Sequence, residues 1–186
     1  MKNILTTVRG LLTLMIVRIG MRLLKWRNRP PKFLIHPDKR LKRIAEPIDF
    51  EHSTYAMRMQ IVRKMNNALG GATYGQRLGL AAPQIGISKR VIIVRGNVMF
   101  NPTWHPTRAP NNTIIEGCYS VPKKMFEVGR APYGWAKWTD INGRPMEDKI
   151  KDLAAIVFQH EIQHLDGQCL PDYGKLIESS SPQAGN

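Results

Sequence analysis

Two histidines in the C-terminal part of the chain, His160 and His164, have the spacing of metal ligands on a helix. Residues four apart on an α-helix lie one above the other, so both imidazoles can point at the same ion. Glu161 follows the first histidine, and in an HExxH motif this glutamate acts as general base toward a water on the metal. The motif is short, so a metallohydrolase is predicted only if its helix and a third ligand are found independently.

The helix that the motif requires is indicated by the residues before it. Over about residues 149–165, side chains that can form one face recur three and four positions apart. They are Ile150, Leu153, Ala154, Val157, Glu161 and His164. Gly167 follows, where a helix is commonly capped. The histidines thus fall on a face that would otherwise be core, which favours a ligand pair over two isolated structural histidines.

The third ligand decides which chemistry is expected. A third histidine of the form HExxHxxGxxH is excluded, because Leu170 stands at that place. Glu178 lies in a serine-rich tail, which is a poor setting for a rigid ligand. Cys118, at the end of a predicted strand, is the better candidate. A thiolate and two imidazoles leave a fourth tetrahedral position open for water, as in catalytic zinc sites.

Another helix is expected upstream, from Ser53 as its N-cap to about Leu69. Its buried stripe is predicted at positions four apart, namely Met57, Ile61, Met65 and Leu69. A loop then leads into residues 79–86, where small residues allow close backbone approach. Gln84 offers a side-chain amide at a fixed place in this segment.

The middle of the chain reads as short strands joined by hairpin turns. A buried strand is expected within residues 89–95, with Gly96-Asn97 as the turn into the next strand. Further strands are predicted at 113–120, 125–130 and 135–140. The absence of a βαβ rhythm predicts an α+β fold, with antiparallel β-sheets packed around a central C-terminal helix that carries HExxH.

Positive charge is concentrated at one end of the chain. The 186 residues, of which 42% are hydrophobic, suffice for one domain with a core. The net charge is +14, and residues 1–46 contribute +10 of it, from 12 basic and two acidic side chains. Two cysteines are too few for a disulfide framework and indicate a reducing compartment, so a cytoplasmic location is expected.

Residues 1–30 are predicted to be a basic, apolar N-terminal extension. Their apolar run, residues 11–17, lies between two arginines and is shorter than the roughly 20 residues that span a bilayer. Basic residues follow where a signal-peptide cleavage site would stand. An amphipathic helix on an anionic membrane, an organellar targeting segment, a helix packed on the domain and a disordered tail remain open. A catalytic domain at 31–175 and a polar tail at 176–186 complete the predicted organisation.

Three stretches resemble the motifs of the peptide deformylase family in order and spacing. They are GLAAPQ at 79–84, EGCYS at 116–120 and QHEIQHL at 159–165. Residues 36–41 are also similar to the start of that family, and the resemblance covers about 33–175. Peptide deformylases remove the formyl group from the initiator methionine of nascent chains. The resemblance therefore implies a hydrolase of protein biosynthesis whose substrates are N-formylmethionyl peptides, with no role for DNA and a monomeric state.

The resemblance also implies a role for each candidate residue. One divalent metal, Fe²⁺ in most of the family with Zn²⁺ or Ni²⁺ as substitutes, would be bound by three side chains. These are Cys118, His160 and His164. Glu161 would take the proton from the metal's water and pass it to the departing amine. The Gln84 amide and the Tyr119 backbone N–H would hold the oxyanion.

The substrate would bind along one backbone segment and in one apolar pocket. Gly79 would let the peptide lie alongside as an added strand. The pocket for the methionine side chain is predicted to be formed by Leu78, Tyr119, Leu153 and Val157.

The sequence departs from the family pattern at two places. Arg77 stands where the first motif usually begins with glycine, so a long cation is expected at the cleft rim. Gln163 replaces the usual aspartate before the second histidine, so Arg130 is expected to rely on Glu116 instead. The chain also lacks the long C-terminal helix of many bacterial members, which resembles the short forms of some bacteriophages.

Two other function classes remain open. An HExxH metalloprotease would use similar chemistry on internal peptide bonds. A non-catalytic protein on the same scaffold could dock on the ribosome or an anionic membrane through residues 1–30. Trp104, Trp135 and Trp138 are expected to pack in the core or between strands rather than to stack on nucleic acid. Cys169 is expected to be a small buried hydrophobe.

Overall fold

The computed structural model describes residues 32–70, 78–110 and 112–177. The predictions made for residues 1–30, for Arg77 and for Glu178 lie outside these ranges. Among the helices of the described residues, none is both long and apolar enough to cross a membrane.

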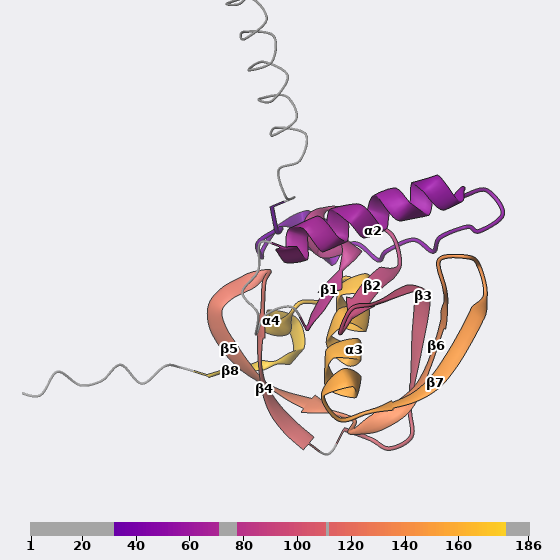
Figure 1. The fold of residues 1–186 in the computed structure, drawn as a ribbon. Coiled ribbons are helices and arrows are strands. Elements are labelled where there is room, and N and C mark those ends of the chain that lie inside the picture. The colour runs from indigo at the N-terminus through magenta and orange to yellow at the C-terminus, as the bar shows by residue number, and fades with distance from the viewer. Residues whose placement is uncertain (1–31, 71–77, 111, 178–186) are drawn as a thin grey trace, which may run out of the picture. The chain divides into compact units, whose positions relative to one another are not determined.

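Two antiparallel sheets form the described part of the chain (Figure 1). The five-stranded sheet has the order β1-β2-β3-β6-β7, and the three-stranded sheet has the order β4-β5-β8. The first consists of β1 (Gly79–Ala81), β2 (Val91–Val94), β3 (Asn97–Pro106), β6 (Tyr133–Thr139) and β7 (Pro145–Lys151). The second consists of β4 (Asn112–Cys118), β5 (Val121–Arg130) and β8 (Lys175–Ile177). The predicted antiparallel α+β class is confirmed, and β8 includes the first two residues of the predicted polar tail.

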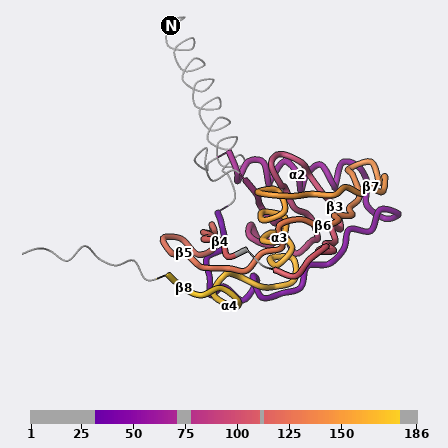
Figure 2. The backbone as a smooth tube through the Cα atoms, turned by 90° about the horizontal axis from the view of Figure 1, so that it is seen from below, coloured from indigo at the N-terminus to yellow at the C-terminus, as the bar shows by residue number. Residues whose placement is uncertain are grey.

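Within the described residues, five helices accompany the sheets. The α-helices are α2 (Tyr55–Gly70), α3 (Asp152–Leu165) and α4 (Leu170–Tyr173), and the 3₁₀ helices are η1 (Lys39–Lys42) and η3 (Ala82–Ile85). Figures 1 and 2 both place α3 between the strands of the two sheets. The motif residues His160, Glu161 and His164 lie on this helix.

Helix α2 begins and packs differently from the prediction. Its N-cap is Thr54, whose Oγ1 accepts the Met57 N–H at 3.2 Å, while Ser53 accepts hydrogen bonds from the Arg58 guanidinium. Met57 is 53% exposed, so the predicted stripe is wrong there. A strict spacing of four drifts around a helix of 3.6 residues per turn. The observed buried residues, Arg58, Val62, Met65, Ala68 and Leu69, follow the true period instead.

The start of α3 is also corrected. The apolar pattern predicted a helix from about residue 149, but α3 begins at Asp152. Residues 145–151 pair with β6 as strand β7, for example Ile150 with Gly134. An apolar residue at Ile150 fits either a helix face or a strand face, so the pairing partner decides its conformation.

Strand β2 holds the core together, because both of its faces are buried. Val91 and Ile93 pack with α2 residues in one cluster. Ile92 and Val94 face the other way and pack with Phe158 of α3. This alternation is the period of two of a β-strand, and it places α2 and α3 on opposite faces of the sheet.

The hairpin between β2 and β3 is displaced by one residue from the predicted turn. Val94 pairs with Asn97, so the two loop residues are Arg95 and Gly96. Their φ angles are 48° and 86°. Two positive φ values are what a type I′ hairpin turn requires.

The end of α3 is fixed by a glycine, as predicted. Gly167 has φ +75°, and the N–H of Gln168 donates to Gln163 O at 2.8 Å. This is the bond pattern of a Schellman cap. A Cβ on Gly167 would lie 2.6 Å from Lys42 O, so this turn is also packed closely against the segment after η1.

We expect Gly167→Ala to lower the free energy of unfolding by about 1–3 kcal/mol, because alanine is strained at this φ and meets backbone atoms. Urea unfolding followed by circular dichroism measures the change. Gly70→Ala is the matched control, since a Cβ there meets nothing within 4 Å. Equal stability of the two variants would contradict this account.

Candidate active site and metal centre

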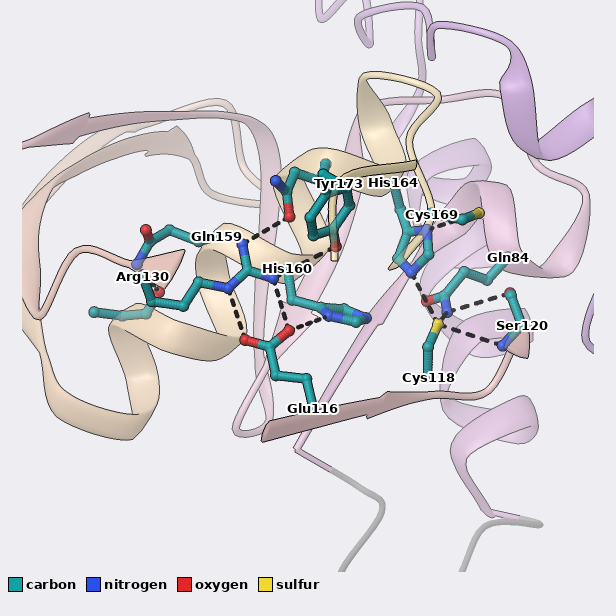
Figure 3. Close-up of polar contacts among 12 residues, drawn as sticks. Gln84, Glu116, Cys118, Ser120, Arg130, Gln159, His160, His164, Cys169 and Tyr173 are labelled. Atoms are coloured by element: carbon teal, nitrogen blue, oxygen red, sulfur yellow. Dashed lines mark hydrogen bonds and ion pairs between the residues drawn. The ribbon is translucent and has the colours of Figure 1, made fainter. Parts of the chain in front are cut away.

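Three side chains from two elements bring their donor atoms together in the interior. Cys118 ends β4, and His160 and His164 lie one turn apart on α3. Their potential ligand atoms all lie within 4.8 Å of one another. Figure 3 shows Cys118 facing His164, with 3.2 Å between Sγ and Nε2. The structure thus brings together the three predicted ligands.

The chemistry of these donors fits a divalent metal. Burial lowers the pKa of His164 well below its ordinary value, so its imidazole is neutral and can donate a lone pair. Burial raises the pKa of the Cys118 thiol to about 12. A thiolate at this place therefore needs a positive charge beside it, which a metal ion supplies. Thiolate and imidazole ligands together suit borderline ions such as Fe²⁺, Zn²⁺ and Ni²⁺.

The orientation of His160 is set by a buried carboxylate. His160 Nδ1 donates to Glu116 Oε2 at 2.9 Å, which leaves Nε2 as the free nitrogen. Glu116 in turn accepts from Arg130 Nε and Nη2, each at 2.7 Å. A histidine ligand held in this way has a fixed tautomer and ring direction.

Gln163 completes the surroundings of Arg130. Arg130 Nη1 donates to Gln163 Oε1 at 2.7 Å. The guanidinium is 2% exposed and its Nη2 also reaches the Tyr173 hydroxyl at 3.4 Å. Arg130 therefore pairs with Glu116, as the sequence suggested, and also keeps a contact with the glutamine that replaces the usual aspartate.

The ion pair determines the ionisation of Glu116. Burial by itself would raise its pKa, but the hydrogen bonds from Arg130 and His160 outweigh burial and hold the pKa at about 2. Glu116 thus remains a carboxylate under all ordinary conditions. It supplies the negative charge that balances the buried guanidinium.

The pKa of Glu161 is shifted in the opposite direction from that of Glu116. Burial, followed by the charge of Glu116, raises its pKa well above the ordinary value. Its Oε2 is buried and has no hydrogen-bond partner among the described residues. A buried carboxylate whose pKa is raised and which has an oxygen without a hydrogen-bond partner among the described residues is suited to proton transfer.

Glycine at position 79 makes room for this carboxylate. A Cβ on Gly79 would lie 2.4 Å from Glu161 Oε1 and 2.5 Å from Val157 Cγ1. The sequence predicted only that Gly79 would admit the substrate backbone. Its closeness to Glu161 could not be foreseen, because the two residues meet only when β1 packs on α3.

The amide of Gln84 is held in one orientation. Its Oε1 accepts the Ala81 N–H at 2.9 Å, which turns Nε2 toward the ligand site. Nε2 lies 3.4 Å from Cys118 Sγ and 3.5 Å from Ser120 Oγ. Gln84 is thus placed beside the metal ligands with an N–H available.

Sequence reasoning missed two residues that position the ligands. The Ser120 N–H donates to Cys118 Sγ at 3.4 Å. Gln159 binds both backbone groups of Ala131, at 3.0 and 2.8 Å, and so ties α3 to the end of β5. A buried glutamine directly before the HExxH motif was the signal for the second, since a buried amide must find partners.

A cleft of about 670 Å³ opens onto these groups. It is lined by Glu161, Gln84, Cys118 and His160, and by all of the predicted substrate-binding residues. These are Leu78, Gly79, Tyr119, Leu153 and Val157. Leu78 and Leu153 are 37% and 44% exposed, so they lie at the rim, while Val157 is buried. Ile115 and Met125 also line the cleft and were not predicted.

The fold and this site define a class: a metal-dependent hydrolase with a Cys-His-His ligand set and a buried glutamate beside it. The family model for polypeptide deformylases matches residues 30–179. The chain therefore belongs to the peptide deformylase family. It is an enzyme that removes the N-formyl group from nascent chains, and the metalloprotease alternative is not supported.

Individual relatives agree with the family model. The peptide deformylase of Pelotomaculum thermopropionicum is 39% identical over 127 residues, which cover 66% of this chain and 81% of that protein. A Plasmodium falciparum peptide deformylase in complex with an inhibitor superposes with a TM-score of 0.69 at 30% identity, covering 77% of this chain and 88% of that one. A Met-Ala-Ser-bound peptide deformylase from Acinetobacter baumannii superposes with a TM-score of 0.66 at 28% identity. The match covers 76% of this chain and 96% of that one.

The depressed pKa of Glu116 predicts how stability depends on pH. A carboxyl whose folded pKa is about 2, against an ordinary 4.5, stabilises the fold fully above pH 4.5 and loses this contribution as the pH falls toward 2. Glu116→Gln removes the titrating group. We expect the variant to be less stable than the wild type at pH 7 and the difference to shrink between pH 4.5 and 2, in urea unfolding at several pH values. A difference that does not change with pH would contradict this.

We expect Gly79→Ala to lower the deformylation rate by about 100-fold or more, because its methyl group displaces Glu161 or Val157 and small misplacements are costly in catalysis. Formate release from a formyl-Met peptide measures the rate. Gly117→Ala is the matched control in the same cleft, since its Cβ meets the flexible Met125 side chain at 3.1 Å and Lys124 O only at an ordinary contact distance of 3.9 Å. Equal rates for both variants would show that the contact with Glu161 is unimportant.

Proposed function

We propose that this deformylase uses Cys118, His160 and His164 to hold one divalent metal, Fe²⁺ in the native enzyme, and uses Glu161 to move the proton. The observation that carries the proposal is the Glu161 carboxylate. It is buried, its Oε2 has no hydrogen-bond partner in the described part of the chain, and it lies in the same cleft as Cys118 and His160. A divalent metal held there would lower the pKa of a water and polarise the formyl oxygen. The choice of Fe²⁺ over Zn²⁺ or Ni²⁺ rests on the resemblance to the family.

Glu161 acts first as a base and then as an acid. Its carboxylate takes a proton from the attacking water, and its raised pKa lets it keep that proton in the low-dielectric interior. It then gives the proton to the departing α-amine of methionine. One carboxylate thus serves both halves of the hydrolysis.

The oxyanion that forms at the formyl carbon is held by N–H donors. Gln84 Nε2 is one donor, because its Oε1 is engaged by the Ala81 N–H and the amide cannot turn round without losing that bond. The Tyr119 backbone N–H is the second. Donors fixed in advance in this way stabilise charge without reorganising during the reaction.

Two open sheet edges support the binding of an extended peptide. Among the described strands, β1 is one edge of the larger sheet and β4 is one edge of the smaller sheet. Gly79 of β1 and residues 114–118 of β4 both line the cleft. A formyl-Met peptide is bound between them as an added strand, with the methionine side chain against Leu153 and Val157.

We infer the wider organisation from the sequence. Helix α3 is the element around which both sheets are arranged, residues 31–175 form the catalytic domain, and the polar tail predicted at 176–186 gives its first two residues to β8. Residues 1–30 bring this cytoplasmic, monomeric enzyme to the ribosome or an anionic membrane, because their charge is strongly positive. A short form similar to those of some bacteriophages is part of this proposal and rests on the resemblance to the family alone.

Glu161→Gln tests the proposed chemistry. We expect formate release from formyl-Met-Ala-Ser to fall by about 100- to 10,000-fold, since the amide cannot accept the proton. Metal content, measured by mass spectrometry after anaerobic purification, should stay the same because Glu161 is not a proposed ligand. Glu127→Gln, at an exposed position of β5, is the control. A Glu161→Gln enzyme with full metal and the wild-type rate would refute the role of Glu161.

A further inference from the structure

One face of the larger sheet lies away from α3 and outside the catalytic cleft. On strands β3, β6 and β7, Trp104, Ala136, Trp138 and Ile150 pack with the α3 core. Side chains alternate along a strand, so the residues between them point to the opposite side. This outer face consists of Thr103, His105, Tyr133, Trp135, Lys137, Glu147, Lys149 and Lys151. Figure 1 shows β6 and β7 at the margin of the described fold, with α3 on their inner side.

The strand register sets aromatic and basic side chains next to each other. Trp135 pairs with His105 of β3 on one side and with Lys149 of β7 on the other. Tyr133 pairs with Lys151, and Lys149 Nζ lies 5.0 Å from the Tyr133 ring centroid. Directly paired residues on one face of a sheet are near neighbours, so these groups form one continuous patch.

The sequence predicted that Trp135 packs in the core or between strands, but its side chain is not part of the core. It is 46% exposed, whereas Trp104 and Trp138 are partly buried against the α3 cluster. Nearly half of the surface of Trp135 thus remains accessible in the middle of a strand. Its ring is therefore available to a partner.

The outer face carries net positive charge. Its single carboxylate, Glu147, lies 3.3 Å from Lys137 Nζ in an exposed ion pair. Lys149 and Lys151 are exposed and have no carboxylate among the residues paired with them, Trp135 and Tyr133. Two cations thus flank the tryptophan without a matching negative charge on this face.

We propose that this outer face binds ribosomal RNA, with Trp135 stacking on an unpaired base and Lys149 and Lys151 contacting phosphates. Aromatic side chains on an open β-sheet are a common platform for single-stranded RNA, and neighbouring lysines follow its backbone. The enzyme acts on nascent chains, so ribosomal RNA is the polyanion next to its substrate. An anionic membrane fits less well, because membrane-binding surfaces insert several apolar side chains and this flat face exposes one large one.

The proposal is separate from the chemistry of the catalytic cleft. None of the outer-face residues lines that cleft. The proposed RNA-binding site lies on the folded domain and is additional to any binding through the positive charge of residues 1–30. It does not depend on the proposed roles of Glu161 or the metal ligands. Variants of the outer face should therefore keep the wild-type rate on a short formyl peptide, and this rate also verifies that they fold.

The test measures binding of the full-length chain to a fluorescein-labelled 12-residue oligouridylate and to purified ribosomes, between 50 and 200 mM salt. Trp135→Ala is expected to weaken binding about 5- to 100-fold, the usual effect of losing one stacked base. Trp135→Tyr should restore most of it. Lys149→Gln with Lys151→Gln should reduce the slope of log affinity against log salt by about 1.4, or 0.7 for each lost phosphate contact.

The matched control is Lys39→Gln with Lys175→Gln, which makes the same change in net charge at exposed positions on η1 and β8. It should bind both RNA probes nearly as the wild type does. The proposal is overturned if the outer-face variants bind as tightly as this control, or if the wild type binds neither probe. It is equally overturned if these residues govern binding to phosphatidylglycerol vesicles but not to ribosomes.

Discussion

Arg130 and Glu116 form a buried ion pair that links β5 to β4 and, through His160, to α3. Taking both charges out of water is unfavourable, and a bidentate contact alone does not always compensate. Here the remaining hydrogen-bonding groups are also used, by His160, Gln163 and Tyr173. Each nitrogen and oxygen of the two charged groups thus has a partner, and the pair fixes the ring of a candidate metal ligand, His160, relative to the smaller sheet.

The same buried surroundings set the ionisation of the candidate ligands and of Glu161. Burial disfavours the charged form of Cys118, His164 and Glu161, and each pKa moves in the corresponding direction. Glu116 is the exception among these groups: its pKa is lowered, because the Arg130 guanidinium donates hydrogen bonds to it. The site therefore consists of one permanent carboxylate that holds the structure and one that can exchange a proton. The pKa values of the two carboxyl groups move in opposite directions, because Glu116 has charged hydrogen-bond partners and Glu161 Oε2 has none among the described residues.

The surroundings of the larger sheet differ from one part of its surface to another. Near β2 both faces are covered by helices, which gives the core its rigidity. At its β1 edge the sheet opens onto the cleft, where Gly79 leaves space for Glu161. On β6 and β7 one face packs on α3 and the other is exposed, with Trp135 among basic side chains. A single antiparallel sheet can thus support catalysis at one edge and recognition on a distant face.

The sequence by itself determined the local features of this protein. A spacing of four residues places His160 and His164 together on any helix, and Gly167 ends that helix because it adopts a positive φ. Only the tertiary structure decided that residues 145–151 pair with β6 instead of extending α3, and that Gly79 lies against the catalytic carboxylate. It also decided which side of β6 faces water. The alternation of side chains along β6 places Trp135 and Trp138 on opposite faces of the sheet. Which of these faces is buried depends on where α3 packs.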